Sequence, residues 1–496
     1  MKKIILSIFI LAISLSACKR IDFGDINQDP SVATEGNIDA LMRGALGSFG
    51  TSGGRVYYSN ATLYSQYQAQ TVYTQEQRYV QYKGSFYAYY INQLKPLREV
   101  YNTTNDVRGN TANMRAIAEL VSVMITKRVT DTYGDIPYFD ALQGSAELTP
   151  GYTPQKDIYL DLLSRAKAAR DMFDDNAFVP DAYTDIYYGG DINKWRKFAN
   201  SLILALSLQL SNTSEAAIAE AAYQEALGNA YGLLEDSADN MVFIPDVTGE
   251  LPNPISRSRA ADFNITKEMT DALKGINPET WGPQLTDPKN VTSNHTFDYR
   301  LYAFTQHGQD GLPYGYDSYP QYADDMNDNL DAEDAPFTLF SAAYTWLNRA
   351  EGVVLGWNTV DTFDDALENG ITESYKQFFA PFSAADQTAA MTYVTGTYIP
   401  ARKADAADAN IGQAQVVGEE KWFALFPDGF AAWAEQRRTG FPELRPAPEA
   451  VNGGVIPHRM LYPDNEKNVN PKGWEQGVQG LLPQEDLNTS KIWWEQ

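Results

Sequence analysis

Apolar residues recur at helical spacing in six long windows, and this periodicity constrains the fold more than any other feature of the sequence. The windows are residues 112–128, 155–174, 193–211, 215–234, 337–354 and 363–380. Strict alternation of polar and apolar residues, which would indicate half-buried strands, is almost absent. The short polar turn around Asn212 predicts an antiparallel helix pair, the unit of helical-repeat scaffolds. The sequence therefore predicts a mainly α protein built from tetratricopeptide-like helix pairs.

The character of the chain changes between about residues 240 and 335. Prolines there accompany many Gly, Asn and Asp residues, from Pro245 to Pro320. A long irregular stretch is uncommon in a compact helical protein and often carries function where it occurs. We expect a loop-rich insertion in this region.

The first residues have the order of a bacterial export signal. Lys2 and Lys3 precede an apolar run that ends in Leu15-Ser16-Ala17-Cys18. The run is too short for a permanent membrane span, which needs roughly 20 residues. Cys18 is the only cysteine in the chain and falls where lipoprotein processing would attach lipid. We expect removal of residues 1–17 and acylation of Cys18, while ordinary secretion with an incidental cysteine is the alternative.

Composition excludes several classes of protein. A single cysteine permits no internal disulfide, and the three histidines are too far apart in sequence for a zinc-type cluster. The net charge of −25 argues against binding of nucleic acid. With 44% hydrophobic residues, the chain has ample material for a large core.

Several segments in order along the chain carry a family resemblance. Residues 130–138 read TDTYGDIPY, residues 195–202 WRKFANSL, residues 420–427 EKWFALFP, residues 432–440 AWAEQRRTG and residues 459–463 RMLYP, before the final Trp493-Trp494. Together they resemble the SusD/RagB family of outer-membrane lipoproteins. The resemblance implies a single helical domain over residues 36–496, tethered through residues 18–35 to the outer membrane and facing the cell surface. It also implies a SusC-like TonB-dependent transporter as partner.

The resemblance implies capture of a nutrient, with oligosaccharide as the first hypothesis and oligopeptide, as in the RagB branch, as the second. A surface glycoside hydrolase is the enzyme alternative. With 64 acidic residues, some carboxylate pair at hydrolase spacing is expected by chance. The sequence contains no nucleophile elbow, no zinc-protease motif and no phosphate-binding glycine loop. We therefore expect no catalysis.

Two loops are the best candidates for ligand contact. In residues 308–322, Tyr314, Tyr316 and Tyr319 alternate with glycine without a helical period, so their rings are expected to face solvent or a groove. A loop packed on its own tyrosines is the alternative. Trp281 lies in a second Pro- and Gly-flanked loop and could stack on a ligand.

Near the N-terminus, Tyr73 precedes a polar turn that contains Gln77 and Arg78, where an aromatic ring, an amide and a guanidinium could meet a ligand. By contrast, Tyr79, Tyr82, Phe86 and Tyr90 recur at helical spacing and are expected to pack along one face of one helix.

The remaining motifs favour structural roles. Trp195, Trp422 and Trp433 fall on helical stripes and are expected in the core, and Trp493-Trp494 is expected to plug the body. Asp131 and Asp135 can cap backbone N–H groups or pair with Arg128. The acidic stretch 324–334 suggests calcium, but its spacing is wrong for an EF-hand loop, and a solvated acidic loop is favoured. No cofactor is expected, with calcium kept as a minor hypothesis.

Overall fold

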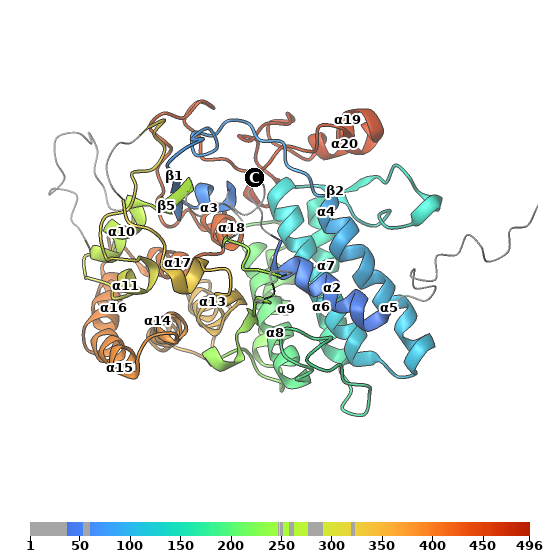
Figure 1. The fold of residues 1–496 in the computed structure, drawn as a ribbon, viewed down its shortest axis with the longest axis horizontal. Coiled ribbons are helices and arrows are strands. Elements are labelled where there is room, and N and C mark those ends of the chain that lie inside the picture. Colours follow the sequence, from blue (N-terminus) through green and yellow to red (C-terminus); the bar gives the residue numbers. More distant parts are fainter. Residues whose placement is uncertain are drawn as a thin grey trace, which may run out of the picture.

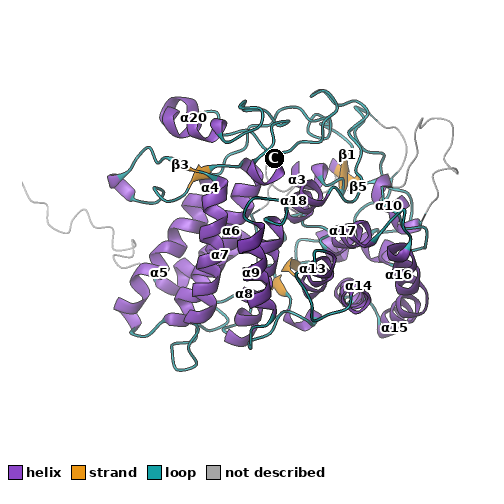
Figure 2. Cartoon of the chain, turned by 180° about the vertical axis from the view of Figure 1, so that it is seen from behind, coloured by secondary structure: helices purple, strands orange, loops and turns teal. Residues whose placement is uncertain are grey.

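The computed structural model describes residues 37–52, 60–246, 248, 251–256, 262–275, 291–318 and 323–496. Two groups of helices lie side by side (Figure 1). Helices from the first half of the chain stand on one side, and α13 to α17 stand on the other. Loops, short strands and the last helices cover one end of both groups, as the reverse view also shows (Figure 2).

The first group contains α2 (Ile38–Gly50), α4 (Tyr87–Tyr89), α5 (Lys95–Arg108), α6 (Ala112–Tyr133), α7 (Gln155–Met172), α8 (Ile192–Gln209) and α9 (Ala216–Leu227). The short helix α3 (Asn60–Tyr64) lies apart from it and packs against residues 429–439 (Figure 1). From α5 to α9 each helix packs against the next one in the chain. This successive pairing confirms the predicted tetratricopeptide-like arrangement. Helices α6 to α9 agree with the predicted windows, although α6 continues to Tyr133 and α9 already ends at Leu227.

The second group contains α13 (Ala342–Val354), α14 (Phe363–Phe379), α15 (Ala384–Tyr393), α16 (Ile399–Ala407), α17 (Gln413–Ala424) and α18 (Gly429–Thr439). The pair α13 and α14 was predicted, and α13 also packs against α8, which joins the two groups. The short helices α19 (Glu466–Val469) and α20 (Pro471–Gln479) follow in the tail.

The described strands are short and form three antiparallel pairs. They are β1 (Gln68–Gln70) with β5 (Phe263–Ile265), β2 (Ile136–Pro137) with β3 (Tyr152–Thr153), and β4 (Met241–Phe243) with β6 (Phe337–Phe340). Between residues 240 and 335 the described elements are brief, including α10 (Lys267–Lys274), α11 (Arg300–Phe304) and α12 (Asp328–Asp331).

Two predicted helical segments are wrong. Residues 337–340 form β6, and the helix begins only at Ala342, because the side chain of Ser341 accepts a hydrogen bond from the N–H of Tyr344 and caps it. Residues 79–90 do not form one helix. Tyr79 lies in a turn with φ of 67°, and helix begins at Tyr87. The tyrosine spacing therefore reflects tertiary packing of separate segments.

The core confirms the roles predicted for the tryptophans. Trp195, Trp422 and Trp433 are buried, and each indole N–H donates to a protein oxygen, on Asp185, Ser65 and Pro457 respectively. Near the C-terminus, Trp494 is buried and its indole N–H donates to Asp131 Oδ1 at 3.1 Å. The predicted aromatic plug is thus present.

The segment 130–138 ends α6 and ties it to distant parts of the chain. Asp131 pairs with Lys127 at 2.7 Å, while Arg128 pairs with Asp428 at 3.2 Å and not with Asp131 or Asp135. Asp135 caps α7 by accepting a hydrogen bond from the N–H of Gln155 at 2.8 Å. These contacts give the segment a structural role.

Candidate ligand-binding site

The structure brings the polar turn after Tyr73 and the tyrosine loop of residues 308–322 together. Tyr73, Gln77 and Arg78 lie against the loop that contains Tyr314 and Tyr316, about 240 residues later in the chain, as the hydrogen bond from Gln77 Nε2 to the carbonyl of Tyr316 at 2.8 Å shows. We call residues 71–80 with 311–318 the loop junction. Cys18, Trp281 and Tyr319 lie outside the described residues.

The loop junction is built on a short sheet. Strand β1 delivers residues 71–80, and its partner β5 is followed by Thr266, which bridges to Leu312. The N–H of Leu312 donates to the carbonyl of Ile265 at 2.8 Å, and the carbonyl of Leu312 accepts from Lys267 at 2.9 Å. Main-chain hydrogen bonds therefore fix both loops to one sheet edge.

Gln77 is a brace inside the junction. It is buried, its Oε1 accepts from the N–H of Gln70 at 2.7 Å, and its own N–H donates to Gln70 Oε1 at 3.2 Å. With its amide nitrogen directed to Tyr316, its polar atoms are used within the protein. Gln77 thus holds the site together, and the structure gives it no free face for a ligand.

Arg78 and Asp317 form the polar centre of the surface. Arg78 Nη2 lies 2.8 Å from Asp317 Oδ1, and the hydroxyl of Thr74 donates to the same carboxylate oxygen at 2.9 Å. From behind, Glu449 accepts the N–H of Asp317 at 2.7 Å, and the N–H of Val451 donates to the carbonyl of Arg78 at 2.9 Å. The Asp317 side chain is 63% exposed and that of Arg78 is 19% exposed, so the carboxylate is the part of the pair that mainly faces solvent.

Tyr314 corrects one expectation. Its ring is buried and lies 6.3 Å from the ring of Tyr79, which in turn lies 6.2 Å from Tyr64. The expectation that its ring faces solvent or a groove is wrong, because the loop folds back onto this aromatic cluster. Gly315 permits the approach: it has φ of 86°, and a Cβ there would lie 2.5 Å from the Cβ of Ala447.

Two tyrosines of the junction reach the surface. Tyr73 is 56% exposed and has φ of 55°, a backbone conformation that is uncommon outside glycine and often marks binding loops. Tyr316 is half-buried. Val72 and Val80 are also exposed, so an apolar and aromatic surface adjoins the Arg78–Asp317 pair.

Behind the junction, Glu268 on α10 lies in a poorly solvated position. Burial raises the pKa of its carboxyl from 4.5 to about 7, although a hydrogen bond from the backbone of Tyr314 offsets part of the shift. Burial also raises the pKa of Tyr79 to about 12, so its phenol stays protonated at neutral pH.

Sequence reasoning missed three residues of the site, namely Thr74, Asp317 and Glu449. Asp317 stood inside the predicted loop, and its position between two tyrosines was the available signal. Nothing in the local sequence marked Glu449, because its role depends on the tail folding over both loops.

The first carboxylate of the acidic stretch is fixed by backbone N–H groups from an earlier segment of the chain. The buried carboxylate of Asp324 accepts hydrogen bonds from the N–H groups of His307 and Gln309. Among the described residues, no group of three or more His, Cys, Asp or Glu side chains is arranged to hold a metal ion.

In the same residues, no helix combines the length and apolar character that a membrane crossing needs.

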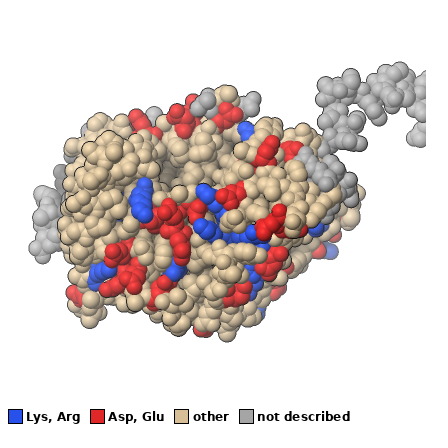
Figure 3. Space-filling model, turned by 90° about the horizontal axis from the view of Figure 1, so that it is seen from below, with Lys and Arg blue, Asp and Glu red and all other residues tan. Residues whose placement is uncertain are grey.

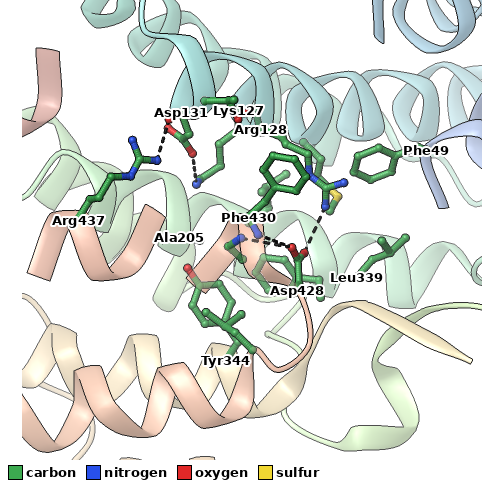
Figure 4. A pocket seen from close by; sticks show the side chains of 16 residues that line it. Phe49, Lys127, Arg128, Asp131, Ala205, Leu339, Tyr344, Asp428, Phe430 and Arg437 are labelled. Carbon is green, nitrogen blue, oxygen red and sulfur yellow. Dashed lines mark hydrogen bonds and ion pairs between the residues drawn. The ribbon is translucent and has the colours of Figure 1, made fainter. Parts of the chain in front are cut away.

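A small cavity of about 80 Å³ lies where the two helix groups meet (Figure 4). Phe49, Phe430 and Leu339 contribute apolar walls, and Lys127 and Arg128 project into it from α6. Both cations are already paired, as the dashed lines in Figure 4 show, and the volume is small for a sugar or peptide. We therefore interpret this cavity as a packing gap between the two helix groups and not as a ligand site.

The face seen from below carries acidic and basic side chains close together (Figure 3). No extended basic area is visible among the described residues on that face. Intermingled charges of this kind give little attraction for a polyanion.

Comparisons with known proteins agree with the fold. Residues 30–463 match a family model described as SusD-like, starch-binding and associating with the outer membrane. No curated protein matches the sequence at a significant level.

Solved structures match nearly the whole chain. A chitin-binding SusD homologue from Flavobacterium johnsoniae is 22% identical, with a TM-score of 0.74 over 93% of this chain and 99% of that one. A SusD homologue from Bacteroides uniformis is 22% identical, with a TM-score of 0.74 over 93% and 100%. One from Parabacteroides distasonis is also 22% identical, with a TM-score of 0.74 over 92% and 97%.

Proposed function

The chain belongs to the SusD/RagB family, and from this premise we propose that it is a nutrient-binding protein that captures oligosaccharide at the loop junction. The family description names starch, and the Flavobacterium johnsoniae homologue binds chitin. These are properties of relatives, and they support a glycan as the class of ligand.

One observation carries the proposal: the exposed Tyr73 directly precedes Thr74, which bonds to the exposed carboxylate of the fixed Arg78–Asp317 pair. The face of Tyr73 can stack on the C–H surface of a sugar ring. Arg78 and Asp317 can donate to and accept from neighbouring hydroxyls, and their mutual contact holds both in place before a ligand arrives. Because the junction is braced by Gln77 and Glu449, little ordering is needed on binding.

The same proposal includes an acyl chain on Cys18 as the anchor and a SusC-like transporter as the recipient of the glycan. Cys18 follows the export signal directly and is the sole thiol. Acyl chains contribute about 0.8 kcal/mol for each buried methylene, so multiple chains hold a protein stably at a membrane. The proposed role is binding without turnover.

The test uses the soluble chain that lacks residues 1–18 on a combined glycan and peptide array, followed by calorimetry on each hit. We expect glycan hits whose affinity falls about tenfold in Tyr73→Ala and in Arg78→Ala, which corresponds to the loss of one stacking or charged contact. Tyr183→Ala is the matched control, because Tyr183 is also 56% exposed and lies elsewhere.

Three outcomes would oppose the proposal. Peptide hits alone would move the protein to the oligopeptide-binding branch. Glycan binding that both variants leave unchanged would remove the loop junction from the site. Release of shortened glycan during the assay would show an enzyme.

A further inference from the structure

A groove in the first helix group resembles a ligand site and is separate from the loop junction. It holds about 350 Å³ and is lined by α5, α6, α7 and residues 137–142. Small organic ligands occupy cavities of roughly 300–1,000 Å³. In Figure 1 these helices lie in the half of the molecule away from β1 and β5. We call this feature the α5–α7 groove.

Four polar side chains in the groove are fixed by one another. Arg165 Nε donates to Glu119 Oε1 at 2.5 Å, and Arg165 Nη1 donates to the hydroxyl of Tyr138 at 2.6 Å. That hydroxyl donates in turn to Asp161 Oδ2 at 2.5 Å. Burial and the neighbouring Asp161 raise the pKa of Tyr138 well above its usual value, so its hydroxyl remains a donor. The chain of hydrogen bonds orients every member.

Three of these side chains have a polar atom outside this network. In the part of the protein that the structure describes, the network uses Glu119 Oε1, Asp161 Oδ2 and the Nε and Nη1 atoms of Arg165, which leaves Glu119 Oε2, Asp161 Oδ1 and Arg165 Nη2 outside it. Two acceptors and one donor are therefore presented together. Arg98, which also lines the groove, balances the second carboxylate, so the lining has no net charge.

Aromatic rings complete the lining. Tyr90, Tyr101, Tyr138 and Phe139 all contribute to the groove, and Phe139 is 54% exposed with its ring 5.0 Å from that of Tyr138. An exposed ring beside fixed donors and acceptors suits a sugar, which has apolar C–H faces and a rim of hydroxyls. A lining without net charge gives no overall electrostatic attraction for a charged ligand.

The groove has room to extend. A second hollow of about 480 Å³ shares Tyr90, Pro137, Ala141 and Leu142 with it and continues toward α19. Leu142, on the wall between the two hollows, has φ of 62°, a strained conformation for a leucine. A chain of several sugar units could lie across both.

From this geometry we propose that the α5–α7 groove is a second binding site for a neutral oligosaccharide. The inference rests on the proposed capture of oligosaccharide and adds a site at the other half of the molecule. Two sites on one protein bind a polymer more tightly than either site alone, because engagement of the second is intramolecular.

The test is calorimetry of the soluble chain that lacks residues 1–18 with chitohexaose and with maltohexaose. Phe139→Ala removes the exposed ring, and Asp161→Asn removes a carboxylate while keeping an acceptor for the hydroxyl of Tyr138. Phe178→Ala is the control, since Phe178 is an exposed phenylalanine outside the groove. We expect two binding events with the sugar that binds, one weakened about tenfold by each groove variant and unaffected by Phe178→Ala.

The outcomes separate this inference from the proposed function. A single event that only Tyr73→Ala and Arg78→Ala weaken would overturn the groove site and keep the junction. A single event that only the groove variants weaken would keep the groove and overturn the junction. Absence of binding by both sugars would overturn the groove site. A fold defect in Asp161→Asn leaves Phe139→Ala as the deciding variant, because its ring is exposed.

Discussion

Glu268 should make the unfolding free energy of the protein depend on pH, and the substitution Glu268→Gln should remove this dependence. The carboxyl lies behind the loop junction, its Oε2 is buried without a hydrogen-bond partner, and burial raises its pKa from 4.5 to about 7. The folded protein therefore holds a proton at pH values where the unfolded chain has lost it. The stability that this proton contributes is fully present below pH 4.5 and is lost as the pH rises through 7.

The size of the effect follows from the shift. A difference of about 2.5 units between the unfolded and folded pKa, at about 1.36 kcal/mol per unit, corresponds to roughly 3 kcal/mol of unfolding free energy. Glu268→Gln cannot ionise, so its stability should not contain this loss. Relative to the native chain, the variant should gain roughly 3 kcal/mol between pH 4.5 and pH 8.

The assay is urea unfolding followed by tryptophan fluorescence at intervals from pH 4.5 to pH 8. Burial also raises the pKa of Asp271 to about 6 and that of Asp135 to about 7, so the native chain alone cannot isolate Glu268. Subtracting the unfolding free energy of the native chain from that of the variant at each pH removes the contributions of Asp271 and Asp135 to first order. Glu475→Gln on the exposed face of α20 is the control for the loss of one glutamate from the chain. A difference for Glu268→Gln that does not change with pH would refute the reasoning.

Two further expectations concern the junction and the anchor. Tyr314→Ala should lower the unfolding free energy by about 3 kcal/mol, because it removes a buried ring, whereas Tyr73→Ala should leave the melting temperature nearly unchanged. Thermal unfolding of both variants checks this, and equal melting temperatures for Tyr314→Ala and Tyr73→Ala would contradict the burial of Tyr314. Cys18→Ala should move the full-length protein from the membrane fraction to the soluble fraction, measured by fractionation and by incorporation of labelled fatty acid. Retention of the variant at the membrane would rule out the cysteine anchor.

The sequence predicted elements whose signals are local and long. Helices α6 and α8 have apolar periods sustained over many residues, and both form near the predicted limits. The prediction failed where a local signal competed with tertiary packing. The spacing of Tyr79 and Phe86 resembles a helix, yet Tyr79 turns inward to the Tyr64 cluster, and β6 takes its residues from the predicted start of α13.

The candidate sites were predictable only where their residues are close together in the sequence. Tyr73 and Arg78 were chosen as candidates because an aromatic residue and a polar turn are adjacent in sequence. The contact of Arg78 with Asp317 joins residues 239 positions apart in the sequence, and no local pattern specifies such a contact. The α5–α7 groove was missed altogether, because Glu119 and Asp161 look like ordinary solvent-facing residues of amphipathic helices until the helices pack.

Buried ion pairs explain how a loop-rich insertion can present an ordered site. Arg300 on α11 is fully buried and contacts Asp298 at 2.6 Å and Glu420 on α17 at 2.8 Å. Nearby, Glu419 accepts from both the N–H and the hydroxyl of Ser293 at 2.7 and 2.6 Å.

Buried pairs of this kind contribute little net stability, but loss of one partner is costly, so they fix one arrangement. Through Arg300 and Ser293, the insertion that leads into the loop junction is held to the helix α17. Loops held in this way lose less conformational entropy on binding than free loops, so weak stacking and polar contacts suffice for capture. The proposed capture and release of a ligand would benefit from this balance, because order comes from the protein interior and the contacts to the ligand can stay individually weak.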